Sequence, residues 1–193
     1  MRIRSLVVPL ALLALVPLMP GRSSVDVDDV PTTGDGFTRE RGTPQDAAKD
    51  ALEGVPPPAM AGKLWRNVKH PVRFTDHLGD VIVVQFWNVQ EPGSRDALVT
   101  LDGLATKLAS QGLVAVAVHP PRHLTEAARW LAKTPLSMPL CVDAGPMETD
   151  FVVDGYPDVH LIGRFGVVRM ADLTDSELER AIDLLLSEPG PGG

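Results

Sequence analysis

Glu91 and Ser94 supply a carboxylate and a hydroxyl at the position in this sequence where a functional site is most expected. They flank a Pro-Gly pair shortly after an apolar run, residues 81–86. A short apolar run bounded by turn residues is typical of a strand that is buried on both faces. The segment that follows, 97–108, repeats leucine at a helical period. We therefore expect Glu91 and Ser94 between the carboxyl end of a strand and the N-terminus of a helix, a usual place for binding or catalysis in α/β proteins.

Glu91 could serve as an acid or base, or it could cap the helix. A carboxylate at a helix N-terminus gains about 0.3–1 kcal/mol from the helix dipole. Nothing nearby in the sequence indicates the environment that acid/base catalysis by Glu91 would require. The capping interpretation is favoured for this reason.

Cys141 is the one cysteine of the chain, which excludes an intrachain disulfide, a cysteine metal cluster and a dithiol redox pair. It lies in the apolar run Leu140-Cys141-Val142. A cysteine in such a run is usually a small core residue whose pKa is raised by burial. We therefore predict that Cys141 belongs to the core.

His119 and His123 are the weak candidates for a metal site. His119 ends the apolar run 113–118, which is predicted to be a strand parallel to 81–86, so it is expected at the same sheet edge as Glu91. The three side chains could hold a metal or form an acid/base pair. No ligand spacing is recognisable, so solvated loop histidines are favoured, and no metal or other cofactor is predicted.

The segment 62–187 alternates strands and helices, which predicts a single α/β domain. Helices are expected over 97–108, 124–132 and 175–186, and strands over 81–86, 113–118, 139–142, 159–162 and 167–169. Residues 65–74 are expected to form a small hairpin or strand pair.

The two ends of the chain have a different composition from this domain. Residues 1–20 combine Arg2 and Arg4 with a short apolar segment, which is typical of a signal peptide or an N-terminal anchor, so the protein is expected to be exported to the periplasm or cell envelope. Residues 21–61 are rich in polar residues, proline and glycine and are expected to be a disordered linker with one short helix over 45–53. Residues 188–193 are expected to be a disordered tail.

The charge of the chain excludes one class of partner. The net charge is −7 and the pI is about 5.1, so binding to nucleic acid has no electrostatic support. Contact with a membrane is expected only through the N-terminal segment, if that segment is retained.

Two motifs resemble the thioredoxin superfamily, in particular its TlpA-like, redoxin-related branch. The first is the strand ending in Phe86-Trp87, which in that branch leads to Cys-x-x-Cys and a long helix; here the motif reads Glu91, Pro92, Gly93, Ser94. The second is Gly155-Tyr156-Pro157-Asp158, before a strand and a hairpin, where the family has a cis-proline that faces the Cys-x-x-Cys turn. The resemblance spans about 62–187 and implies a three-layer α/β/α fold with a central mixed sheet.

The resemblance implies a degenerate active site, because both cysteines of the motif are replaced. Gln85 also stands where thioredoxins often hold a buried acid. The expected role is a non-redox or structural module that binds a protein or an extended peptide in the groove by Pro157. The expected binding residues are Trp87, Gln90, Glu91, Tyr156 and Pro157. Trp87 is also expected to lie in the core. The alternatives are the thiol-disulfide oxidoreductase or peroxiredoxin-like activity of the family, and a metal-dependent activity at Glu91 and His119.

Overall fold

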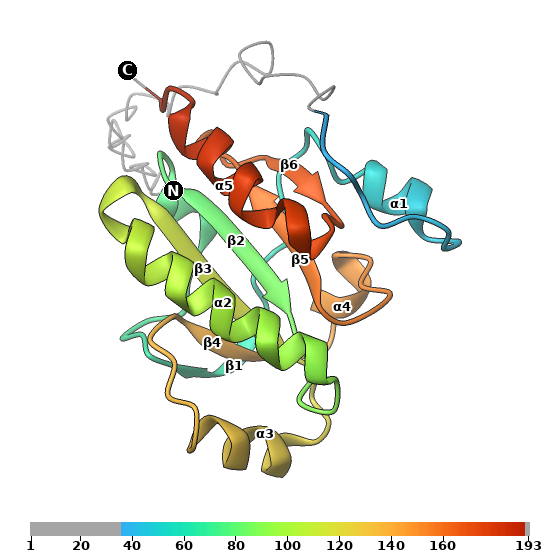
Figure 1. Cartoon of the computed structure of the whole chain (residues 1–193), viewed down its shortest axis with the longest axis vertical. Coiled ribbons are helices and arrows are strands. Elements are labelled where there is room, and N and C mark those ends of the chain that lie inside the picture. The colour runs from blue at the N-terminus through green and yellow to red at the C-terminus, as the bar shows by residue number, and fades with distance from the viewer. Residues whose placement is uncertain (1–35, 192–193) are drawn as a thin grey trace, which may run out of the picture.

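A six-stranded mixed sheet organises the protein, whose computed structural model describes residues 36–191 (Figure 1). The strand order is β1-β4-β3-β2-β5-β6. The strands are β1 (Gly62–Arg66), β2 (Val81–Phe86), β3 (Leu113–His119), β4 (Leu140–Asp143), β5 (Asp158–Ile162) and β6 (Val168–Ala171). The apolar run 81–86 is therefore a central strand, and all of its residues are buried.

The predicted strand–helix–strand unit is confirmed. β2 and β3 are parallel, with Val81 beside Leu113 and Phe86 beside Val118, and α2 (Pro92–Leu108) connects them. β4 is parallel to β3 and follows α3 (Leu124–Leu131). β5 and β6 form the expected antiparallel hairpin, and β5 also pairs antiparallel with β2. The sheet is mixed, as predicted.

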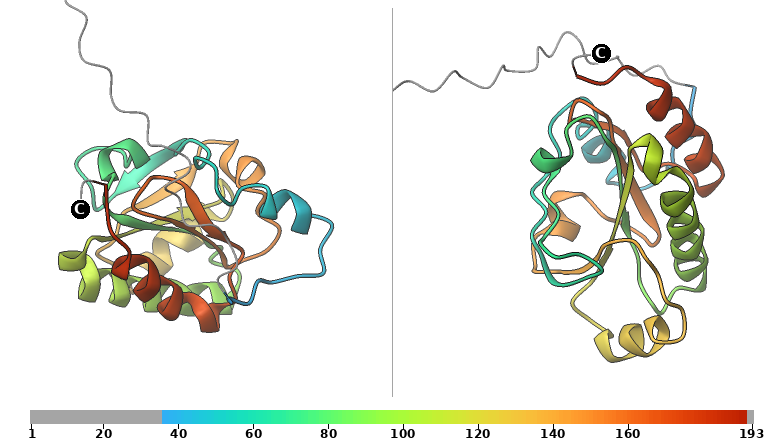
Figure 2. Two further views of the ribbon diagram at one scale, coloured as in Figure 1. Left: turned by 90° about the horizontal axis from the view of Figure 1, so that it is seen from above. Right: turned by 90° about the vertical axis from the view of Figure 1, so that its left-hand side faces the viewer.

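Helices α2 and α5 (Leu178–Ser187) lie on one face of the sheet and shorter segments lie on the other (Figure 2). Each face carries its own cluster of buried apolar side chains. On one face, α2 and α5 pack their leucines against Val81 and Val83. On the other, residues of α4 (Met147–Asp150), the 3-10 turn η2 (Phe74–His77) and the segment 52–61 pack against Ile82 and Val84. The three-layer α/β/α arrangement is confirmed, with one outer layer built mostly from short and irregular pieces.

Several boundaries differ from the sequence-based expectations. α2 begins at Pro92 rather than at 97, because proline fits the first position of a helix. The hairpin expected over 65–74 is wrong: β1 pairs antiparallel with β4 instead. Asn67, just after β1, donates side-chain hydrogen bonds to the carbonyls of Leu136 and Met138, which ties this edge to the loop before β4. α5 is preceded by a 3-10 turn, η4 (Asp175–Glu177).

The expectation of a disordered linker is wrong for residues 36–61. This segment contains α1 (Asp46–Asp50), whose start is fixed by Thr43: its hydroxyl accepts a hydrogen bond from the Gln45 N–H and donates one to Asp46. Arg39 forms an isolated bridge with Leu173, and Glu53 accepts a hydrogen bond from the Ala171 N–H. The segment thus lies against the β6 edge of the domain.

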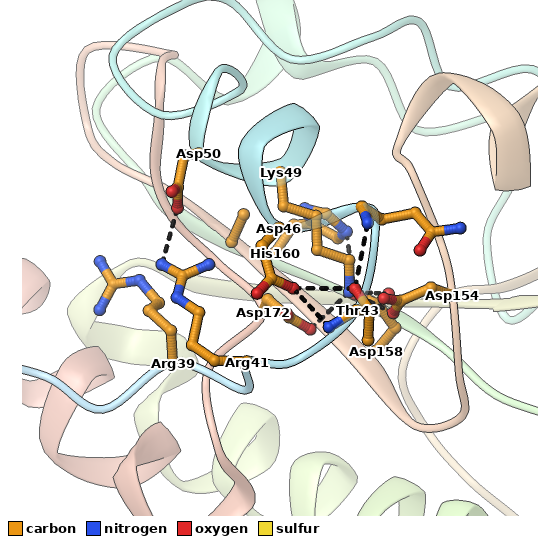
Figure 3. Close-up of polar contacts among 12 residues, drawn as sticks. Arg39, Arg41, Thr43, Asp46, Lys49, Asp50, Asp154, Asp158, His160 and Asp172 are labelled. Atoms are coloured by element: carbon orange, nitrogen blue, oxygen red, sulfur yellow. Dashed lines mark hydrogen bonds and ion pairs between the residues drawn. The ribbon is translucent and has the colours of Figure 1, made fainter.

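Lys49 is the residue that anchors this segment (Figure 3). Its side chain is fully buried, and its Nζ lies 2.6 Å from Asp154, 2.8 Å from Asp158 and 2.5 Å from Asp172. Burial alone would lower the pKa of Lys49, but the charge of Asp158 and the hydrogen bonds to the three carboxylates outweigh it and raise the pKa. The lysine therefore stays cationic and is the counter-ion of an acidic cluster in which Asp158 and Asp172 are buried.

The predictions for residues 1–35, including the signal peptide or anchor and the first part of the linker, lie outside the described residues, as do residues 192 and 193. Within 36–191, no helix combines the length and the apolar composition needed to cross a lipid bilayer.

Candidate functional site

The turn between β2 and α2 is closed by hydrogen bonds within it. Ser94 is fully buried, and its Oγ accepts a hydrogen bond of 3.0 Å from the backbone N–H of Asn88. The side-chain oxygen of Asn88 accepts one of 3.1 Å from the Gln90 N–H, and the Asn88 carbonyl accepts another from the Glu91 N–H. The Ser94 hydroxyl therefore stabilises the turn.

Glu91 occupies the N-cap of α2, with extended backbone dihedrals, φ −97° and ψ 111°. Its side chain is exposed and forms no capping hydrogen bond. Glu91 therefore lies at the predicted position, the N-terminus of α2. The predicted capping hydrogen bond of its carboxylate is wrong, because the side chain does not bond to the backbone N–H groups of the helix. The helix dipole still favours an anion there.

The Tyr156–Pro157 peptide bond is cis, as predicted from the resemblance. Tyr156 and Glu91 line the same hollow, of about 430 Å³, so the residue before Pro157 and the first residue before α2 border one space. Neither the backbone N–H nor the carbonyl of Tyr156 forms a hydrogen bond with another residue of the described part of the chain. A residue that lines the hollow thus has one donor and one acceptor of the main chain without a partner among the described residues.

Arg122 and Glu148 fix the side chain of Tyr156. The Tyr156 hydroxyl donates to Glu148, and Arg122 donates to the hydroxyl at 2.7 Å. Arg122 also pairs with Glu148 at 3.2 Å and stands over the ring, 5.6 Å from its centroid. The tyrosine ring is thereby held in one position beside the open main-chain groups. Sequence patterns gave no sign of Arg122 or Glu148, because their contacts join separate loops.

His119 and His123 do not form a metal site with Glu91. His119 is buried, and both ring nitrogens are engaged: Nδ1–H donates to the Pro120 carbonyl at 2.8 Å, and Nε2 accepts the Val89 N–H at 3.3 Å. Burial lowers the pKa of His119, which keeps it neutral. The expectation that His119 is a solvated loop residue is therefore wrong. Its buried side chain instead stabilises the β2–α2 turn through the hydrogen bond from the Val89 N–H. His123 is exposed.

Cys141 is buried, as predicted, with 3% of its surface exposed. Burial raises the pKa of its thiol to about 12, so hardly any thiolate forms near neutral pH. Gln85 is fully buried in β2, and neither atom of its amide has a hydrogen-bond partner within residues 36–191. Neither side chain can supply the thiolate or the mobile proton of a dithiol site.

Trp87 lies in the core, as predicted, and is 1% exposed. Its ring packs edge-on against His119, with centroids 4.6 Å apart, and at 5.4 Å from Trp130. Trp87 is therefore not a residue that a peptide beside Pro157 could touch. Gln90, by contrast, is exposed and lines a second hollow on the α3 side of the turn, together with Arg95, Arg129, Trp130 and Lys133.

One cluster with the composition of a metal site is present among the described residues: Asp154, Asp158 and Asp172. The ammonium of Lys49 occupies the space between their oxygens (Figure 3), so the cluster already holds its cation. His160, also fully buried, adds its Nε2 at 3.0 Å from Asp158. We interpret this cluster as structural.

The chain matches no family model and no curated protein, whereas many solved structures share its fold. A thioredoxin-like superfamily protein superimposes with a TM-score of 0.62 at 20% identity, covering 71% of this chain and 99% of that one. The thiol:disulfide interchange protein DsbE from Chlorobium tepidum gives 0.59 at 24% identity, with 69% and 96% covered. A thiol-disulfide isomerase from Corynebacterium glutamicum gives 0.59 at 20% identity, with 68% and 97% covered. These similarities show a thioredoxin-like fold, as the two sequence motifs predicted.

Proposed function

We propose that this protein is an exported, TlpA-type thioredoxin-like module that has lost disulfide exchange and binds an extended segment of another protein beside Pro157. The observation that carries the proposal is the open backbone N–H and carbonyl of Tyr156, next to the exposed turn at Glu91. An extended peptide can pair with such groups as an added strand, and this needs no cysteine. The short apolar segment within residues 1–20 supports export to the periplasm or cell envelope.

The alternative is thiol-disulfide oxidoreductase activity, since the structural neighbours include a thiol:disulfide interchange protein, a thiol-disulfide oxidoreductase and a thiol-disulfide isomerase. The reaction needs a thiolate that attacks a disulfide and a second thiol that resolves the mixed disulfide. Here Glu91 and Ser94 occupy the two motif positions, and the single thiol, Cys141, is buried in β4. The metal-dependent alternative loses support because both nitrogens of His119 are already bonded.

The charges on the two sides of the turn indicate which peptide would fit. In the hollow at Tyr156, Glu148 is paired with Arg122 and Asp154 with Lys49, whereas the exposed carboxylate of Glu91 has no ion pair within residues 36–191, which favours a basic residue of the partner. The hollow at Gln90 holds Arg95, Arg129 and Lys133 against one glutamate, which favours an acidic residue. We propose that the bound segment carries a basic residue toward Pro157 and an acidic one toward α3.

Binding of synthetic extended peptides tests this proposal. A fluorescent peptide of alternating valine and threonine with one central lysine should bind the protein, as measured by anisotropy. The same peptide with N-methylated backbone amides should bind about tenfold more weakly, because the strand pairing is lost. Glu91→Lys should weaken binding of the lysine peptide by a similar factor through like-charge repulsion.

The matched control is Glu179→Lys, which makes the same charge change at an exposed position of α5. It should leave the affinity for the peptide unchanged. Equal affinity for the methylated and unmethylated peptides would rule out strand pairing at Tyr156.

A second prediction tests whether the two cysteines are all that the redox site lacks. The parent protein should reduce no disulfide substrate, whereas Glu91→Cys with Ser94→Cys should gain measurable exchange. The first thiol would be exposed at the helix N-terminus, where its pKa should fall below the free value of about 8.5, and the second would replace a buried hydroxyl. Insulin reduction and thiol titration measure the two effects.

The double variant is best made with Cys141→Ser, so that no third thiol contributes. Each single cysteine variant should remain inactive, because it cannot resolve a mixed disulfide. Disulfide reduction by the parent that disappears in Cys141→Ser would overturn the non-redox proposal.

A further inference from the structure

An apolar hollow of about 370 Å³ lies between α3 and the edge formed by β1 and β4, apart from the site at Pro157. Its lining includes Leu64 and Trp65 of β1, Leu124 and Leu131 of α3, and Cys141 of β4. Its volume and its mostly apolar walls are those of a small-molecule site, which typically measures about 300–1,000 Å³. It shares no lining residue with the hollow at Glu91 and Tyr156.

The apolar face of α3 is only partly covered by the rest of the protein. Ala127 is its one buried residue, while Leu124 is 36% exposed. Across the hollow, Leu64 is 65% exposed on the edge strand. In Figure 1, α3 stands at the end of the molecule, with β1 and β4 as its nearest strands. Apolar side chains on two opposing walls therefore face a space that no described segment fills.

Arg66 is the one charged residue in the lining of this hollow. Its side chain forms no hydrogen bond or ion pair with any residue between 36 and 191. An unpaired guanidinium is a preferred partner of a carboxylate, to which it can donate two parallel hydrogen bonds. The hollow thus combines apolar walls with a single cation that lacks a counter-ion.

We propose that this hollow binds a small amphipathic carboxylate, with its hydrocarbon chain between α3 and β1 and its carboxylate on Arg66. Strand addition by a protein partner is disfavoured here, because β1 is irregular: Leu64 and Asn67 have φ values of 53° and 62°, and the register with β4 shifts between Lys63 and Arg66. Such irregularity on an edge strand opposes further pairing. The charge of Arg66 selects an acid over a neutral lipid of the same length.

Titration with octanoate tests the proposal. Binding should change the fluorescence of the protein, because Trp65 and Trp87 line the hollow, and should be seen independently by calorimetry. Arg66→Gln should weaken octanoate binding about tenfold, through loss of a charge-assisted contact, and leave the binding of octanol unchanged. Ala128→Trp, at an exposed lining position of α3, should abolish the binding of both.

Thr125→Trp is the matched control, because it adds the same bulk to an exposed position of α3 outside the lining. It should bind octanoate like the parent. Absence of octanoate binding, or equal affinity in the parent and in Arg66→Gln, would overturn the proposal. So would concentration-dependent dimerisation that Ala128→Trp abolishes, since a second copy would then fill the hollow. None of these outcomes depends on peptide binding at Pro157.

Discussion

Replacement of Lys49 by methionine is expected to lower the free energy of unfolding by about 3–5 kcal/mol, the usual cost of removing one partner from a buried ion pair. The variant would leave Asp154, Asp158 and Asp172 close together without their cation, and the lysine they lose is fully buried. Chemical denaturation followed by circular dichroism measures the loss. Hydrogen exchange should also show faster opening of residues 36–61, because Lys49 anchors that segment.

Lys107→Met is the matched control. Lys107 makes one ion pair, with Glu179, in which both side chains are more than half exposed. Its removal should cost no more than about 1 kcal/mol. Adding Asp158→Asn to Lys49→Met should restore part of the lost stability, because one uncompensated charge disappears. A Lys49→Met variant as stable as the parent would show that the acidic cluster does not need the lysine.

Trp87→Ala is expected to cost about 3–5 kcal/mol through the cavity that it leaves. Trp87 is 1% exposed and packs against His119 and Trp130 between β2 and α3. Since His119 in turn accepts the Val89 N–H, we expect the β2–α2 turn to loosen as well. Denaturation measures the first effect, and hydrogen exchange of the turn measures the second.

Two further variants serve as comparisons for the loss of stability in Trp87→Ala. Trp87→Phe should cost clearly less, because it keeps an aromatic ring and removes an indole N–H that has no hydrogen-bond partner among the described residues. Leu184→Ala, at an apolar position of α5 that is 39% exposed, should change stability little. A Trp87→Ala variant that unfolds like the parent would contradict the packing of this region.

The central strands of the sheet could be predicted from local patterns in the sequence. Apolar runs alternating with leucine-rich helical segments predicted β2, α2 and β3 in parallel arrangement, because burial on both faces demands continuous apolar residues. The single cysteine determined that no dithiol pair exists, and its apolar neighbours placed it in the core. The second thioredoxin-like motif predicted a cis-proline at Pro157, and the Tyr156–Pro157 bond is cis.

The roles of the polar residues could not be predicted from local patterns, because their partners are distant in the sequence. The composition of residues 36–61 indicated disorder, yet Lys49 orders this segment through carboxylates that lie 105, 109 and 123 positions further along the chain. His119 was expected in solvent, but the fold buries it and binds both of its nitrogens. Apolar periodicity is a local signal, because burial repeats with the geometry of each helix or strand. The partner of a charge or of a hydrogen-bond donor depends on which distant segments the fold brings into contact. Such contacts leave no local pattern in the sequence.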